Sequence, residues 1–111
     1  MELIKLSDFE KIDIRIGQII SAKLNEKALI PAYILAIDFG DLGIKTSSAQ
    51  LTQNYTETAL IGRKICAVVN FPTKRVAGIK SEVLVLASIC KNHGTLLLHA
   101  DNKATNGSKI F

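Results

Sequence analysis

The sequence predicts an all-β fold, a five-stranded Greek-key barrel with a short helix between the third and fourth strands and another short helix near the N-terminus. Three observations favour it: β-branched and apolar residues recur in short runs, turn residues separate the runs, and one stretch between the third and fourth runs is helical in pattern. The chain has 111 residues, of which 48 % are hydrophobic. That length and composition suffice for one domain over residues 1–111 with its own apolar core.

The N-terminal part is predicted to be a short helix followed by two strands. Ser7 and Glu10 have the spacing of a capping box, so a helix of one or two turns is expected around Asp8–Lys11. Alternating side chains over Ile14–Ile20 are typical of a half-buried strand, and the compact apolar run Ala32–Phe39 is predicted to be the second strand.

Turn residues and a change of pattern define the rest of the fold. Gly40 and Gly43 favour a hairpin into a third strand over Ile44–Thr52. The stretch Gln53–Gly62 departs from the β pattern and contains a short helix. The strands predicted after it are Lys64–Phe71, Glu82–Cys90 and, as the second half of a final hairpin, Thr95–Ala100. This order of elements is that of an OB-fold, a small Greek-key barrel.

Positive charge is concentrated in the second half of the chain. The net charge of +4 divides into −1 for residues 1–55 and +5 for residues 56–111. From Arg63 to Lys80 there are five cations and no acid. Such a segment attracts phosphates, whose neutralisation releases counterions, although a basic face exposed only to solvent would have the same composition.

The sequence contains no recognisable catalytic or metal-binding pattern. His93 and His99 lack metal-ligand spacing, the acids are scattered, and Cys66 and Cys90 are too few for a four-ligand zinc site. We therefore expect a protein that is not an enzyme and that needs no metal or cofactor. Charges interrupt every apolar stretch of residues 1–10, so we expect no secretion signal and a cytoplasmic protein with buried, reduced thiols.

The most informative segment is Val68–Ala87. Two apolar runs flank a connection that carries Lys74, Arg75 and Lys80. A polar loop on a rigid scaffold is a common way to build a binding site. The alternative is that the proline and glycine of this loop only shape the connection, while its cations keep the loop solvated.

Several segments together resemble one family. They are Asp13–Ile19, Ile37–Gly40, Ile44–Thr52, Asn70–Pro72 and Ala77–Leu86. In order and spacing they closely resemble the CsaA family, which belongs to a wider group of tRNA-binding OB domains also appended to some methionyl- and phenylalanyl-tRNA synthetases. The resemblance covers residues 8–110. It implies a stand-alone OB-fold homodimer that binds tRNA, with a proposed export-chaperone role in which it binds unfolded or presecretory polypeptides.

Two departures from the pattern of the wider tRNA-binding group affect how far the properties of that group can be expected of this chain. Lys27–Ala32 replaces the His-Pro-Xaa-Ala-Asp stretch of the synthetase domains, a difference that CsaA-like members share. The loop has Thr73 and Lys74 where relatives often have a second proline and more arginine. Lysine keeps the charge but gives up bidentate phosphate geometry, so we expect weaker or less oriented phosphate contacts.

With this resemblance, the candidate RNA-binding residues can be named. For phosphates they are Lys45, Lys74, Arg75 and Lys80, and for sugar or phosphate hydrogen bonds Ser47, Ser48, Gln50, Asn70 and Ser81. Aromatic residues are only 5 % of the chain, which suits recognition of RNA by shape and backbone better than base stacking.

Polypeptide binding is the alternative main activity. It requires an accessible apolar groove beside the basic loop. The residues that could line such a groove are Phe71, Pro72, Val76 and Ile79. The sequence leaves both ligands open, and they are not mutually exclusive.

Overall fold

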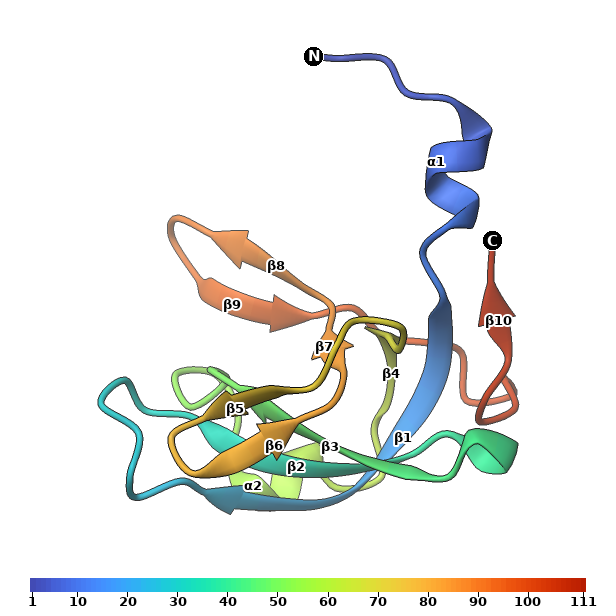
Figure 1. The fold of residues 1–111 in the computed structure, drawn as a ribbon. Coiled ribbons are helices and arrows are strands. Elements are labelled where there is room, and N and C mark those ends of the chain that lie inside the picture. The colour runs from blue at the N-terminus through green and yellow to red at the C-terminus, as the bar shows by residue number, and fades with distance from the viewer.

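The long strand β1 (Ile14–Leu24) organises the barrel, because it pairs antiparallel with β2, β4 and β10 (Figure 1). The computed structural model describes all 111 residues. The main sheet has the order β3-β2-β1-β4-β7 and is nearly closed, and two separate hairpins, β5–β6 and β8–β9, are attached to it. The other elements are α1 (Leu6–Glu10), β2 (Tyr33–Asp38), η1 (Gly40–Leu42), β3 (Ile44–Ala49), α2 (Glu57–Leu60), β4 (Lys64–Val68), β5 (Lys74–Val76), β6 (Ile79–Ser81), β7 (Leu84–Val85), β8 (Ala87–Cys90), β9 (Gly94–Leu97) and β10 (Lys109–Ile110).

The core lies inside the barrel and is built from alternate residues of the strands. Leu35 and Ile37 of β2 are fully buried, together with Phe39 just beyond its end. Gly17 is required opposite them, because a Cβ atom at this position would lie 2.6 Å from the Phe39 ring. Leu60 of α2 is buried in the same cluster, so the short helix closes part of the core.

The predicted fold class is confirmed, including the short helix between the third and fourth strands, which is α2. The predicted strand Glu82–Cys90 is instead two strands, since β7 pairs with β4 whereas β8 leaves the barrel and pairs with β9. The third strand ends at Ala49 and the last hairpin strand at Leu97, both earlier than predicted.

The N-terminal helix is confirmed, but its predicted cap is wrong. The helix begins at Leu6, which places Ser7 inside it. The Asp8 carboxylate accepts a hydrogen bond from the backbone N–H of Lys5 at 3.0 Å. A carboxylate in the first turn of a helix is a favourable partner for an N-terminal amide, and here Asp8 takes the role that the predicted box gave to Glu10.

The connection that was expected to be a loop is the β5–β6 hairpin. Its two-residue turn has positive φ angles at Ala77 (45°) and Gly78 (86°), as turns that join tightly twisted strands require. Ala77 is the only residue other than glycine with a positive φ. Alanine adopts this conformation at a cost of about 1–2 kcal/mol, so the surrounding contacts must hold the turn in place.

Both cysteines are free and half-buried. Burial raises the pKa of the Cys66 thiol, which keeps it protonated and unreactive near neutral pH. No helix of the structure has the length and apolar character that crossing a membrane would need.

Candidate nucleic-acid interface

The β5–β6 hairpin carries positive charge that no acid neutralises. Its register places Arg75 directly opposite Lys80, and both side chains are exposed. The ion pairs of the structure are Lys11–Asp8 and Arg15–Asp13, so neither hairpin cation has an acidic partner. Like charges facing each other across two strands are destabilising. A bound anion would relieve this repulsion.

The hairpin is fixed to the free edge of β3. The Ser48 backbone N–H donates to Ser81 Oγ at 3.1 Å. One residue further along, the Glu82 N–H donates to the Thr46 carbonyl at 2.8 Å, and Glu82 Oε1 accepts from the Thr46 N–H at 3.1 Å. These bonds continue the sheet beyond β3, so the hairpin cations are held by the barrel and do not lie on a free loop.

A second basic segment lies beside the hairpin turn. In the loop of residues 25–32 between β1 and β2, Asn25 Nδ2 donates to the Ala77 carbonyl at 3.2 Å. A groove of about 380 Å³ separates the base of this loop from the hairpin, and two lysines and one acid, Lys23, Lys27 and Glu26, lie on its loop side. Gly78 faces Lys27, since a Cβ atom there would lie 3.4 Å from the lysine Cδ.

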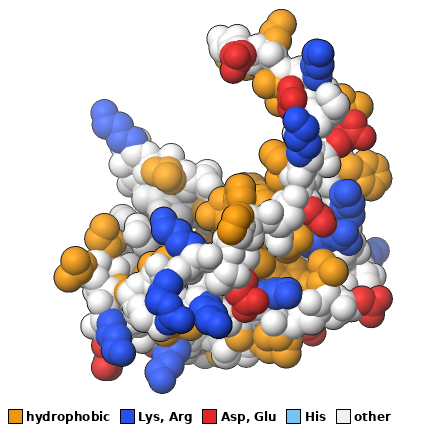
Figure 2. Space-filling model, viewed as in Figure 1, with side chains coloured by type: hydrophobic (Ala, Val, Ile, Leu, Met, Phe, Trp, Pro, Cys, Tyr) orange, Lys and Arg blue, Asp and Glu red, His pale blue; other side chains and the backbone are white.

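We call the resulting surface the basic face. It consists of Lys23, Lys27, Lys74, Arg75 and Lys80. Figure 2 shows Lys and Arg side chains gathered over the β5–β6 hairpin and the neighbouring loop. The first two residues were missed because they belong to the half of the chain whose net charge is negative. The predicted fold itself pointed to these two residues, because OB-folds bind oligonucleotides with the loops that follow strand 1 and strand 4.

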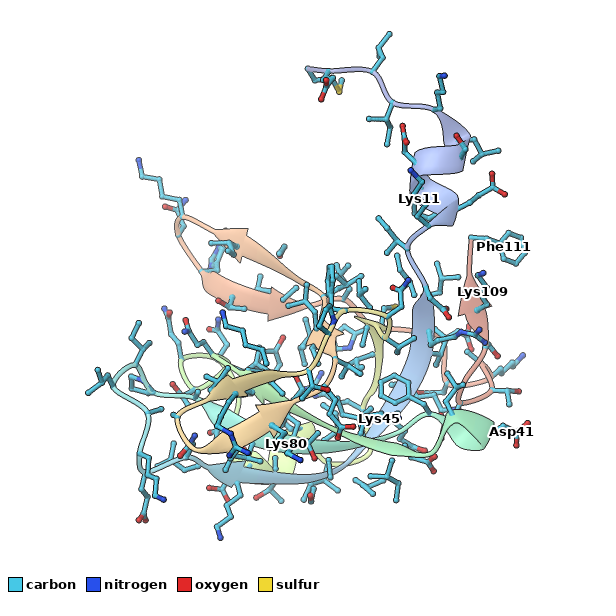
Figure 3. The ribbon with its side chains drawn as sticks, in the orientation of Figure 1. Lys11, Asp41, Lys45, Lys80, Lys109 and Phe111 are labelled. Carbon is cyan, nitrogen blue, oxygen red and sulfur yellow. The ribbon has the colours of Figure 1, made fainter.

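The predicted β3 residues face different directions. Lys45 pairs with the buried Ile37 of β2, so its side chain is on the same side of β3 as that of Ser47. Ser48 is on the opposite side. Figure 3 labels Lys45 on this strand. Ser47 is 1 % exposed, and its hydroxyl donates to the Val83 carbonyl at 3.0 Å. Its hydroxyl therefore belongs to the core in this structure, while Gln50, just after β3, is exposed.

Asn70 uses its whole amide group to hold the chain together. Its Oδ1 accepts from the Asp13 N–H at 3.0 Å, and its Nδ2 donates to the Lys11 carbonyl at 2.8 Å. These bonds join the end of β4 to the segment that follows α1. Asn70 thus has a structural function whether or not it also contacts a ligand.

The four residues predicted to line a peptide groove do not line one groove. Phe71 is 53 % exposed, and with Pro72 it borders a shallow cavity of about 270 Å³ that Lys74 and Leu84 also line. Ile79 lies in the groove beside the loop of residues 25–32. Val76, next to the turn, is half-buried and borders neither cavity.

The remaining titratable residues form no further site. His99 lies 3.4 Å from an Arg63 nitrogen, and Arg63 packs over the Tyr55 ring at 5.1 Å. No group of three or more His, Cys, Asp or Glu side chains is placed to hold a metal ion.

Comparison with known proteins agrees with this geometry. The family model for the tRNA-binding domain matches residues 14–109. A crystal structure of the CsaA chaperone protein from Picrophilus torridus is 49 % identical, with a TM-score of 0.92, and covers 98 % of this chain and 100 % of that one. The chain belongs to the CsaA family of tRNA-binding-domain proteins. The chaperone CsaA from Bacillus anthracis is 47 % identical to this CsaA-family chain, with a TM-score of 0.93 and coverage of 99 % and 100 %.

The CsaA-family chain also matches part of longer proteins. Methionine–tRNA ligases from Methanococcoides burtonii and Pyrococcus horikoshii are 29 % and 31 % identical over 98 % and 99 % of this chain. The chain spans only 16 % and 15 % of those ligases. A MetRS-related protein from Pyrococcus horikoshii, 22 % identical with a TM-score of 0.89, shares the fold.

Proposed function

We propose that this chain is a tRNA-binding protein that holds folded tRNA on the basic face and carries out no catalysis. The observation that carries the proposal is the uncompensated pair of Arg75 and Lys80 on an anchored hairpin, with Lys23 and Lys27 across the groove. Phosphates would neutralise this charge and release counterions. Membership of a tRNA-binding-domain family supports RNA as the polyanion.

Recognition in this proposal depends on the shape and backbone of the RNA. Phe71 is the one partly exposed aromatic side chain that adjoins the basic face, at Lys74, and a single ring does not make a platform on which successive bases stack. Tyr33 is buried, and the Tyr55 hydroxyl accepts from the Leu97 N–H at 3.0 Å. An A-form helix presents phosphates and 2′-hydroxyls rather than base edges, which suits lysine, arginine and Ser48. The domain would comprise residues 1–111, and its ligand would place it in the cytoplasm.

Fluorescence anisotropy with labelled RNA tests this function. Affinity for folded tRNA should fall as salt rises, because each phosphate contact contributes about 0.7–0.9 to the slope of log K against log salt. An unstructured polyuridine strand of equal length should bind more weakly. Equal affinity for both RNAs would contradict recognition by shape, and affinity independent of salt would contradict phosphate binding.

Polypeptide binding is a second candidate, favoured by the cavity beside Phe71. Exposed apolar atoms of Phe71, Pro72 and Leu84 adjoin one lysine and one glutamate there, which suits apolar segments of unfolded or presecretory polypeptides. An export-chaperone role would use this cavity. Two labelled apolar peptides, one with flanking aspartates and one without, can be titrated with the protein to test this candidate function. If neither peptide binds, the cavity is not a polypeptide-binding site.

The same proposal includes a homodimer. Leu3, Ile4 and Leu6 are exposed on an arm that projects from the barrel, and Phe111 lies beyond β10 near α1 (Figures 1 and 3). Apolar residues of α1 and the C-terminal segment line a cavity of about 300 Å³ between them. A second copy would cover these side chains. Sedimentation at micromolar concentration should give twice 12.1 kDa, and a monomer there would contradict this.

A further inference from the structure

The loop of residues 25–32 ends in an apolar tip that the fold does not use. Leu29 is 101 % exposed and Ile30 is 62 % exposed, so neither contributes to the core. The loop projects from the barrel beside the β5–β6 turn (Figure 1), and Figure 2 shows hydrophobic side chains at that outer edge, next to Lys and Arg side chains. Two aliphatic side chains held in solvent beside a cationic groove need an explanation outside the core.

The base of this loop is rigid. Asn25, which is 6 % exposed, begins it: its N–H donates to the Ala32 carbonyl at 2.9 Å, and its Oδ1 accepts from the Lys27 N–H at 3.1 Å. Asn25 Nδ2 also binds the carbonyl of Ala77. Pro31, which follows the tip, has a fixed φ angle. The base of the loop is therefore held in place and fixes where the tip projects, which lowers the entropy cost of bringing the tip against a ligand.

The position of the tip restricts what it can meet. Leu29 and Ile30 lie two and three residues after Lys27 in the same loop. A ligand whose phosphates reach Lys27 in the groove would bring the adjoining part of its surface over the tip. In a nucleic acid, the only extensive apolar surface is the plane of a base that is not covered by another base. Leucine, isoleucine and proline are the residues that proteins place against such planes.

We infer that Leu29 and Ile30 pack against an exposed base face of the bound tRNA while the basic face holds its phosphates. This inference depends on the tRNA-binding function proposed above and adds a specificity determinant to it. An RNA with a base pair or base left unstacked at a helix end or corner offers this surface, whereas a continuous duplex does not. The tip would thus favour folded RNA with exposed base planes over other polyanions of equal charge.

A double variant with a matched control tests the inference. Leu29→Ser with Ile30→Ser removes the apolar tip, and Ile61→Ser removes a comparably exposed aliphatic side chain. Ile61 is a suitable control because the N–H of the next residue, Gly62, donates to the carbonyl of Ile19 in the middle of β1, whereas the tip follows the end of that strand. The two ligands are a tRNA and a dumbbell RNA of equal phosphate number, in which non-nucleotide caps stack on both ends of the duplex and leave no base plane exposed.

The expected result is specific to one RNA. The double variant should bind tRNA about tenfold more weakly than the unaltered protein, the loss expected when two partly buried aliphatic side chains are truncated. Its affinity for the dumbbell and its salt slope for tRNA should not change, and Ile61→Ser should change neither affinity. Circular dichroism should show an intact barrel, since the replaced side chains are outside the core.

Each of the following outcomes would overturn the inference. Unchanged tRNA affinity, or an equal loss for both RNAs, would remove the base-face contact and leave tRNA binding itself standing. If the unaltered protein binds no tRNA, both the proposed function and the inference fail. If the double variant keeps its tRNA affinity but loses flotation with phosphatidylserine vesicles, the tip meets a lipid surface instead.

Discussion

Replacing Lys80 with glutamine would separate the effect of the hairpin charge on folding from its effect on RNA binding. Lys80 faces Arg75 across the β5–β6 hairpin, and neither has an acidic partner. Removing one of two facing like charges should stabilise the fold by about 0.5 kcal/mol. For a chain of this size that raises Tm by about 2 °C. Thermal melting followed by circular dichroism measures it.

The same substitution should weaken tRNA binding in a salt-dependent way. Loss of one phosphate contact reduces the slope of log K against log salt by about 0.8. When salt rises fourfold, for example from about 50 to 200 mM, the fall in affinity should therefore be about threefold smaller than for the unaltered protein. Changing Lys74, Arg75 and Lys80 together to alanine should make the fall about 30-fold smaller.

The matched control is Lys103→Gln, which removes the same charge from an exposed lysine outside the basic face. If the two single variants reduce the salt slope equally, only net charge matters and the hairpin is not the phosphate site. A fall in Tm for Lys80→Gln would refute the repulsion argument, because it would mean that the lysine has a stabilising partner in the folded state.

Three further predictions concern other parts of the molecule. Asn70→Ala should lower Tm, with a free-energy loss of about 1–2 kcal/mol, because two backbone groups lose their partner. A hydrogen bond from Arg15 holds the pKa of the Asp13 carboxyl below its ordinary value. The ionised carboxylate therefore stabilises the fold when the pH is above the ordinary pKa, and this stabilisation is lost as the pH falls through the lowered pKa. Asp13→Asn should thus lower Tm at pH 7, and melts at decreasing pH should show the difference shrinking. Phe71→Ala should weaken apolar peptide binding in titrations while Tm falls by less than a fully buried aromatic would cause, since the side chain is half-exposed.

The barrel could be predicted because its signals are local. Turn glycines such as Gly40 and Gly43 take positive φ angles, and the buried side of β2 follows the alternation of its sequence. The β5–β6 hairpin could not be predicted in this way. Its strands are three residues long and charged, and its turn begins with Ala77, a residue that rarely adopts a positive φ. The contact of the turn with Asn25, made only after folding, helps to hold that conformation.

The residues of the candidate site also differ in whether local sequence signals could predict them. Arg75 and Lys80 could be found from charge density, because they are close in sequence and exposed in the fold. Lys23 and Lys27 join them only through a contact between residues that are 52 positions apart. Charge counted along the chain cannot detect a surface that two distant segments form together.

Polar side chains without charge were harder to assign, and the reason is physical. Ser47, Ser81 and Asn70 each bond to backbone groups of a neighbouring segment, and these bonds fix β3, the hairpin and the N-terminal segment in place. A buried or edge amide must find a partner, and short polar side chains are the available donors and acceptors. Some cations are used in the same way, since Arg15 and Arg63 donate to the carbonyls of Gly107 and Ala59. Lys23, Lys74 and Lys80 make no such hydrogen bond and remain in solvent. On this small barrel, an exposed cation without a hydrogen bond to the backbone is therefore a better candidate for a ligand contact than a short polar side chain, because much of the uncharged polarity is used by the fold itself.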